Sequence, residues 1–231
     1  GGLLRNEESE LKNYRYIFWD LHGTLRDTYE GVSKSVQYAL EFYGIHIEDR
    51  ETLRKFIGPP LRESFPGVAH LPEEYVEAAV ARYRERYHPI GIFECRPFPG
   101  VKEALASFRK AGKIQVVSSS KPEGMCLRVL DKFNLTGWFD QVVGASEDGR
   151  IDTKAQVLAE AFRRLREADP SFSPEDAVLI GDTRFDAEGA AQAGMDCIGV
   201  SYGFGTREEL LEHGALKVCD SLEELQNFLY I

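Results

Sequence analysis

The sequence is poor in cysteine, in long apolar runs and in net positive charge. Only four cysteines (Cys95, Cys126, Cys197 and Cys219) occur among 231 residues. None forms a CxxC pair, and no nearby histidine completes a zinc-binding pattern. A disulfide framework and a zinc finger are therefore excluded, and free thiols in a reducing compartment are expected.

Long apolar runs are also missing. No run approaches the ~20 residues that a membrane-spanning helix needs. The first 13 residues, which begin with Gly1-Gly2, contain no apolar segment of the kind found in secretion signals. We expect residues 1–13 to be a polar lead-in, and the protein to be cytoplasmic with no membrane partner.

The shortage of positive charge limits the classes of partner. Lys and Arg number 28 against 38 Asp and Glu, which gives a formal net charge of −10. Such a protein repels polyanions, so nucleic acid and anionic membrane surfaces are not expected as main partners. A small phosphorylated metabolite is still compatible, because a few local cations and a metal ion outweigh a distant field.

The sequence does contain the alternating pattern of an α/β protein. Short, nearly continuous apolar runs lie at residues 16–19, 114–117, 142–143, 178–180 and 197–200. Runs of this kind are typical of strands buried on both faces of a parallel sheet, and helical patterns separate them. They predict a doubly wound, Rossmann-like sheet. Three segments match a capping box and predict helix starts at Ser120, Thr206 and Ser221.

One stretch of about ninety residues between the first two runs has no convincing strand, which is far longer than a usual connection. Within it, Val32, Val36 and Leu40 follow helical spacing, and the stiff sequence RPFPG closes it at residues 96–100. We therefore expect an all-helical insert over residues 26–95. The core would then consist of residues 14–25 and 96–231.

Polar residues gather where three of the predicted strands end. The first strand is followed by DLHGTL (residues 20–25), the second by SSSK (118–121) and the strand at 178 by GDTRFD (181–186), while Lys154 begins a helix. Ligands of open parallel sheets bind beyond the carboxyl ends of the strands, so these segments are expected to converge. Each alone is more often a turn or a helix cap. Together, the carboxylates favour Mg²⁺, the hydroxyls and lysines favour a phosphate, and a carboxylate facing phosphorus can attack it.

These segments resemble the motifs of the haloacid dehalogenase superfamily. DLHGTL is similar to the first motif, DxDGT, and GDTRFD is similar to the fourth, GDxxxD, while Ser119 and Lys154 stand where the second and third motifs fall. Order and spacing agree from Tyr14 onward, including a helical cap between the first two motifs. FIGPPLRESF (residues 56–65) and SYGFG (201–205) further resemble the phosphoglycolate phosphatase-like branch, which includes pyrophosphatases and nucleotidases.

The resemblance implies a phosphatase that cleaves a small phosphate monoester through an aspartyl-phosphate on Asp20. It assigns Mg²⁺ to Asp20, the main-chain carbonyl of His22, Asp182 and Asp186.

For the phosphoryl group, the resemblance implies a hydrogen bond from Ser119, with the adjacent Ser118 as the alternative, and charge neutralisation by Lys154. Ser120 would also contact substrate. Gly58 and Arg62 would do so from a cap loop that closes over the site and excludes water.

His22 departs from the family pattern, which has an aspartate at this position as general acid and base. Positioned proton transfer is worth roughly 10²- to 10⁴-fold in rate, but imidazole also carries protons near neutral pH. Three interpretations are therefore open: His22 is a substitute acid and base, the enzyme is weakened and retains binding, or the reaction is altered.

Two rival functions are open, one within enzymes and one from another class. A haloacid dehalogenase also uses an aspartate nucleophile and lacks the second aspartate, but its site needs no metal, which the pair Asp182 and Asp186 argues against. A phosphate-binding or phosphoacceptor regulator is the other rival. Receiver domains of that kind are nearer half this length, and their acidic pair precedes the acceptor.

Overall fold

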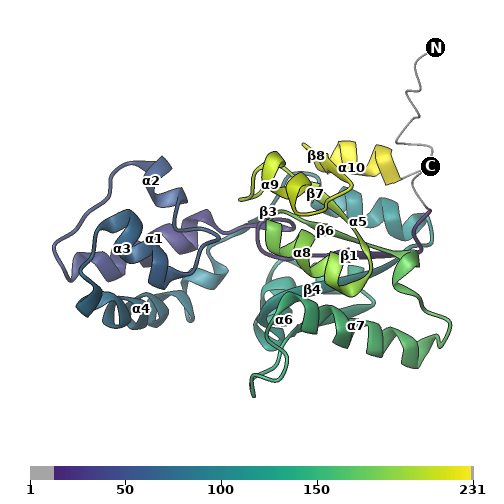
Figure 1. Ribbon diagram of the computed structural model, residues 1–231, viewed down its shortest axis with the longest axis horizontal. Coiled ribbons are helices and arrows are strands. Elements are labelled where there is room, and N and C mark those ends of the chain that lie inside the picture. Colours follow the sequence, from purple (N-terminus) through teal and green to yellow (C-terminus); the bar gives the residue numbers. More distant parts are fainter. Residues whose placement is uncertain (1–12, 230–231) are drawn as a thin grey trace, which may run out of the picture. The chain divides into compact units, whose positions relative to one another are not determined.

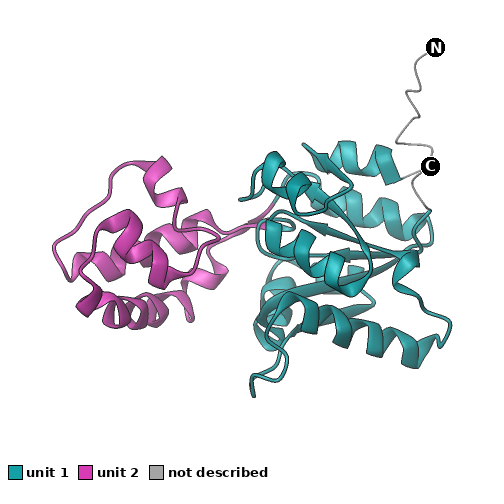
Figure 2. Ribbon diagram, in the orientation of Figure 1, with its two compact units in different colours: residues 1–25, 98–231 teal, residues 26–97 magenta. Residues whose placement is uncertain are grey.

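The structure is a computed structural model that describes residues 13–229; residues 1–12, nearly all of the predicted lead-in, lie outside the described residues. The chain divides into two compact units (Figure 2). Unit 1 comprises residues 1–25 and 98–231, and unit 2 comprises residues 26–97. That unit 2 acts as a cap stays a prediction.

Unit 1 is built on a six-stranded parallel sheet. Its strands are β1 (Tyr16–Trp19), β4 (Ile114–Pro122), β5 (Gln141–Ala145), β6 (Ala177–Gly181), β7 (Asp196–Val200) and β8 (Lys217–Cys219). They pair in the order β5-β4-β1-β6-β7-β8. The chain extends the sheet to one side through β4 and β5 and then adds β6, β7 and β8 on the other side of β1. The predicted doubly wound α/β fold is confirmed.

Helices of unit 1 cover both faces of this sheet (Figure 1). They are α5 (Val101–Lys110), α6 (Glu123–Lys132), α7 (Lys154–Ala168), α8 (Arg184–Ala193), α9 (Arg207–Glu212) and α10 (Leu222–Leu229). The neighbours Phe18 and Trp19 in β1 point to opposite faces, so Phe18 packs on Phe162 of α7 and Trp19 packs on Phe108 of α5. Burial on both faces explains why the strand runs are continuously apolar.

Unit 2 is helical, with a short ribbon at its two ends. It contains α1 (Tyr29–Glu41), α2 (Arg50–Arg54), α3 (Leu61–Ala69) and α4 (Glu73–Tyr87), and the antiparallel pair β2 (Arg26–Asp27) and β3 (Arg96–Pro97). Val36 and Leu40 of α1 are fully buried, as their helical spacing predicts. Arg26 is also buried and donates to the carbonyl of Ile92 and to the hydroxyl of Tyr87.

The capping box predicted at Ser120 is wrong. The strand β4 continues to Pro122, and α6 begins only at Glu123, with no side-chain cap. The carboxylate of Glu123 instead accepts from the N–H of Gly144 on β5. At the other two predicted starts, the hydroxyls of Thr206 and Ser221 accept backbone N–H groups three residues further on.

Two further sequence expectations can be compared with the described residues. None of the helices between residues 13 and 229 is both long and apolar enough to cross a bilayer. All four cysteines are buried.

Candidate active site

The candidate site lies at the carboxyl edge of the sheet, where β4, β1 and β6 are neighbours. Asp20 directly follows β1, and Asp182 directly follows β6. The backbone N–H of Asp20 donates to the carbonyl of Ile180 at 2.9 Å, which fixes the Asp20 backbone beside β6. The strand order thus brings the ends of three motif-bearing strands together.

Three aspartates gather there around one lysine. Carboxylate oxygens of Asp20, Asp182 and Asp186 all lie within 4.8 Å of one another. The Nζ of Lys154 is 3.5 Å from Asp20 Oδ1 and 3.0 Å from Asp186 Oδ1. Lys154 thus pairs with two of the three carboxylates, and a set of hard oxygen donors with excess negative charge suits Mg²⁺.

Two of the carboxylates are held from several sides. Asp182 accepts from the hydroxyl of Thr24 at 3.2 Å and from the N–H of Phe204 at 3.0 Å. Asp186, at the third position of α8, accepts from the N–H groups of Asp182 and Thr183 at 3.1 and 3.2 Å. Asp182 and Asp186 are almost completely buried, whereas Asp20 keeps 17% of its side chain exposed. Asp20 is therefore the most accessible carboxylate of the three.

Glycines allow this close packing. Gly23 has a φ of +80°, and a Cβ there would stand 2.0 Å from Asp182 Oδ2. At Gly189 on α8, a Cβ would stand 2.6 Å from Cγ of Lys154. Both the turn after Asp20 and the approach of α8 to Lys154 thus require the absence of a side chain.

The burial and crowding of these carboxylates change their ionisation. Desolvation first, and then the charge of Asp186, raise the pKa of Asp20 well above its usual range. The same two causes raise the pKa of Asp182 to about 7. Burial alone would lower the pKa of Lys154, but the charges of Asp186 and Asp20 outweigh it and keep the ammonium protonated.

The hydroxyl row differs from residue to residue. Ser118 is completely buried, its carbonyl accepts from Lys154 Nζ at 2.6 Å, and its hydroxyl has no hydrogen-bond partner among the described residues. The Ser119 hydroxyl, also buried, accepts from the N–H of Lys121 at 3.2 Å, and Ser120 is exposed. The lysine contact joins this row to the carboxylate group, but the phosphate-binding role of Ser119 or Ser118 stays a prediction.

The other predicted site residues fall in two places. His22 lies two residues after Asp20 and is half-buried. Gly58 and Arg62 belong to unit 2, where the Arg62 guanidinium binds the Glu77 carboxylate at 2.5 and 3.2 Å. That Gly58 and Arg62 contact a substrate stays a prediction.

Sequence reasoning missed several residues that hold the carboxylates. Thr24 and Phe204 lie inside quoted motifs, but nothing in the sequence identifies them as donors to Asp182. Gly189, which makes room for Lys154, was missed as well, because it stands in an ordinary helix. A glycine in the middle of a helix is unfavourable, and this is the one signal that could have drawn attention to it.

Comparison with known families agrees with this arrangement. The model of a family described as haloacid dehalogenase-like hydrolase matches residues 17–200. Among solved structures, a predicted phosphatase from Clostridium acetobutylicum has a TM-score of 0.80 and 38% identity, and the match covers 95% of this chain and 100% of that one. The resemblance inferred from the motifs is confirmed.

Individual relatives have names of more than one kind. A 5'-nucleotidase from Pseudomonas aeruginosa is 35% identical over 94% of this chain and 96% of that protein. Tyrosine-protein kinase PtkA from Mycobacterium tuberculosis is 34% identical over 87% of this chain and 67% of that protein. Phosphoglycolate phosphatases from Aquifex aeolicus and two Pseudomonas species match at 27% to 28% identity.

Proposed function

The chain belongs to the haloacid dehalogenase-like hydrolase family, and from this membership we propose that it is a Mg²⁺-dependent phosphohydrolase acting through an aspartyl-phosphate on Asp20. The substrate would be a small phosphate monoester. One observation carries the proposal: a partly exposed aspartate stands beside two buried aspartates and a buried lysine at the carboxyl edge of the sheet. That set can hold a metal ion, balance charge and attack phosphorus.

The donor set fits Mg²⁺. Asp20, Asp182 and Asp186 offer hard carboxylate oxygens close together, and the main-chain carbonyl of His22 would be the fourth ligand from the protein. When bound, Mg²⁺ would neutralise charge on the carboxylates and on the phosphoryl oxygens. The raised pKa values of Asp20 and Asp182 agree with this fit, because burial first and the charge of Asp186 second disfavour their ionised forms, and a bound cation would offset both effects.

Asp20 is proposed as the nucleophile because of its position and exposure. Its Oδ1 accepts from the N–H of Leu21 at 2.8 Å and lies 3.5 Å from Lys154 Nζ, so the carboxylate is oriented and remains reachable. In the first step an Asp20 oxygen attacks phosphorus, the bond from phosphorus to the ester oxygen breaks, and His22 donates a proton to the leaving alcohol. Lys154 balances the negative charge throughout.

In the second step water attacks the phosphorus of the aspartyl-phosphate. His22, now neutral, takes a proton from that water, the bond between phosphorus and Asp20 breaks, and inorganic phosphate leaves. Ser119, or Ser118 beside it, would donate a hydrogen bond to the phosphoryl oxygens in both steps. Ser120, with Gly58 and Arg62 from unit 2, would contact the rest of the substrate.

The names of the relatives guide the choice of substrates to test. Purified protein with Mg²⁺ should be assayed against nucleoside monophosphates, phosphoglycolate, pyrophosphate, a phosphotyrosine peptide and a chlorinated acid. We expect phosphate release from at least one small ester, its loss in excess chelator, and its loss in Asp20→Asn.

Other outcomes would contradict the proposal in distinct ways. Release of chloride without metal would favour the dehalogenase. Binding of inorganic phosphate without turnover of any ester, combined with turnover by His22→Asp, would favour a weakened regulatory protein. Transfer of phosphate to a tyrosine in place of water would favour a phosphotransferase.

A further inference from the structure

Near its end, β4 departs from regular pairing with β5 at the polar residues 119–121, a bulged segment that is called the loop of residues 119–121. Ser118 pairs with Val143 of β5, and the next pairing joins Pro122 to Ala145. Residues 119–121 thus stand opposite the single residue Gly144. This segment carries Ser119 and Ser120, and the regular pairing with β5 is interrupted along it, so contacts outside the ladder contribute to holding it.

The chain just after this segment presses against β5. A Cβ at Gly144 would lie 2.5 Å from Cα of Glu123 and 2.6 Å from the carbonyl oxygen of Lys121. The N–H of Gly144 donates to Glu123 Oε1 at 3.3 Å. The start of α6 is therefore seated on Gly144, and Glu123 is the side chain that secures it.

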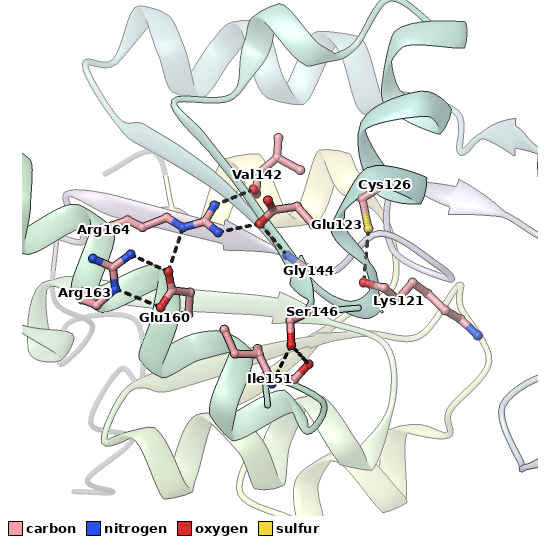
Figure 3. A network of polar contacts seen from close by, with 10 residues as sticks. All are labelled: Lys121, Glu123, Cys126, Val142, Gly144, Ser146, Ile151, Glu160, Arg163 and Arg164. Atoms are coloured by element: carbon pink, nitrogen blue, oxygen red, sulfur yellow. Dashed lines mark hydrogen bonds and ion pairs between the residues drawn. The ribbon is translucent and has the colours of Figure 1, made fainter. Parts of the chain in front are cut away.

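Arg164 of α7 joins Glu123 to two other elements (Figure 3). Its Nη2 is 2.8 Å from Glu123 Oε1, its Nη1 donates to the Val142 carbonyl at 3.2 Å, and its Nε donates to Glu160 at 3.1 Å. The side chains of Arg164 and Glu123 are only 26% and 32% exposed. Arg163 and Arg164 hold the pKa of Glu160 at about 2, so this carboxylate stays ionised. A half-buried, branched guanidinium network of this kind is more rigid than a single surface ion pair.

We infer that Glu123 and Arg164 are positioning residues that hold the loop of residues 119–121 against β5 and α7 and thereby set its phosphate-binding hydroxyls. This inference rests on the proposed function of Ser119. Arg164 lies on the same helix as Lys154, whose Nζ contacts the Ser118 carbonyl. α7 thus contacts both ends of the loop region: Lys154 contacts its beginning, and Arg164 contacts Glu123 just after it.

The expected effect separates substrate binding from chemistry. Lys154 is fixed by its own contacts with Asp186 and Ser118, so loss of the Arg164 contact loosens the loop and leaves Lys154 in place. Hydroxyls that bind phosphate equally in the ground state and in the transition state contribute mainly to KM. Glu123→Gln and Arg164→Gln should therefore raise KM for para-nitrophenyl phosphate, and Ki for inorganic phosphate, about ten-fold, with a smaller change in kcat.

Matched controls lie on the same helix. Glu167→Gln removes a carboxylate that pairs with Arg163, and Arg166→Gln removes a guanidinium that lies over the rings of Phe162 and Phe172; neither residue contributes to the ion pairs that join Glu123, Arg164 and Glu160. Both controls should keep the wild-type KM. The double variant of Glu123 and Arg164 should raise KM no further than either single variant, because both belong to one unit. Arg164→Lys keeps the positive charge but loses the planar set of guanidinium N–H donors, so it should give an intermediate KM.

Amide hydrogen exchange of the peptide that spans residues 118–123 provides a readout independent of catalysis. Exchange should be faster in Glu123→Gln and Arg164→Gln than in the wild type and in both controls. Wild-type exchange and KM in Glu123→Gln and Arg164→Gln, or equal changes in the controls, would overturn the positioning role. If the wild type hydrolyses no ester, the proposed function fails, and the exchange experiment alone decides whether these two residues hold the loop.

Discussion

The three aspartates at the carboxyl edge of the sheet carry the same ionisable group and have different surroundings. All three carboxylates accept from backbone N–H groups, but Asp182 and Asp186 are buried, whereas Asp20 is partly exposed. The motifs predicted all three positions. They could not predict the contacts to Thr24 and Phe204, because these come from chain segments that only the fold brings to Asp182.

His22 is the residue whose chemistry the sequence leaves most open, and its substitution tests the proton-transfer role. His22→Ala should lower kcat for an alkyl phosphate by about 10²-fold or more, because the leaving alkoxide needs a proton. The loss should be smaller for para-nitrophenyl phosphate, whose leaving group departs unprotonated. His22→Asp should keep or raise activity and shift the pH profile.

The control for this experiment is the wild-type ratio of kcat for the alkyl phosphate to kcat for para-nitrophenyl phosphate. Equal kcat values of His22→Ala and wild type on the alkyl ester would make His22 a spectator. Activity in His22→Asp alone would identify the natural chain as a disabled phosphatase.

At the scale of elements, the central strands could be predicted because burial on both faces leaves a continuous apolar signal. The end of β4 could not be predicted, because SSSK has the composition of a loop and the extension of the strand through Pro122 depends on pairing with Ala145. The prediction of a helix start at Ser120 was wrong for a related reason. The carboxylate of Glu123 has tertiary partners, Gly144 and Arg164, that no local pattern shows.

The contact between α8 and α7 gives a prediction at this scale. In Gly189→Ala the new methyl carbon would meet Cγ and Cβ of the buried Lys154 at 2.6 and 3.0 Å, so the two helices must separate or the lysine must move. We expect a loss of about 1–3 kcal/mol in the free energy of unfolding, because the site is overpacked. Displacement of Lys154 should also lower kcat/KM by about 10²-fold.

Gly124→Ala is the matched control for stability. A Cβ at this exposed position of α6 meets no atom within 4 Å, so the change should stabilise the protein by about 0.4–1 kcal/mol, because alanine restricts the unfolded chain. Denaturant unfolding measures both variants. Equal stability of Gly189→Ala and Gly124→Ala would contradict the close packing of α8 on Lys154.

For the whole molecule, the group of aspartates buried at the carboxyl edge of the sheet affects the pH dependence of stability. Asp182 has a pKa of about 7 in the folded protein, against an ordinary value of 3.8 for an aspartate. Between these values the folded state binds more protons than the unfolded state, so stability falls as pH rises. Metal-free protein should therefore have a lower Tm at about pH 8 than at about pH 5.

Two comparisons test the origin of this slope. Asp182→Asn should reduce it, since the amide cannot ionise and can still accept from Phe204. Added Mg²⁺ should raise Tm more at the higher pH, because it binds the ionised carboxylates of the folded state. A Tm in chelator that rises over the same pH range would contradict the charge excess at Asp20, Asp182 and Asp186.

The central claim is that Asp20 becomes phosphorylated during turnover, and trapping the phosphorylated enzyme tests it most directly. Wild-type protein with Mg²⁺ and para-nitrophenyl phosphate should be quenched in acid during turnover, digested at low pH and analysed by mass spectrometry. We expect the mass increment of one phosphoryl group on the peptide that contains Asp20, absent in Asp20→Asn and absent in chelator. Phosphate release at the wild-type rate by Asp20→Asn, or a phosphoryl group trapped on a peptide without Asp20, would contradict the account.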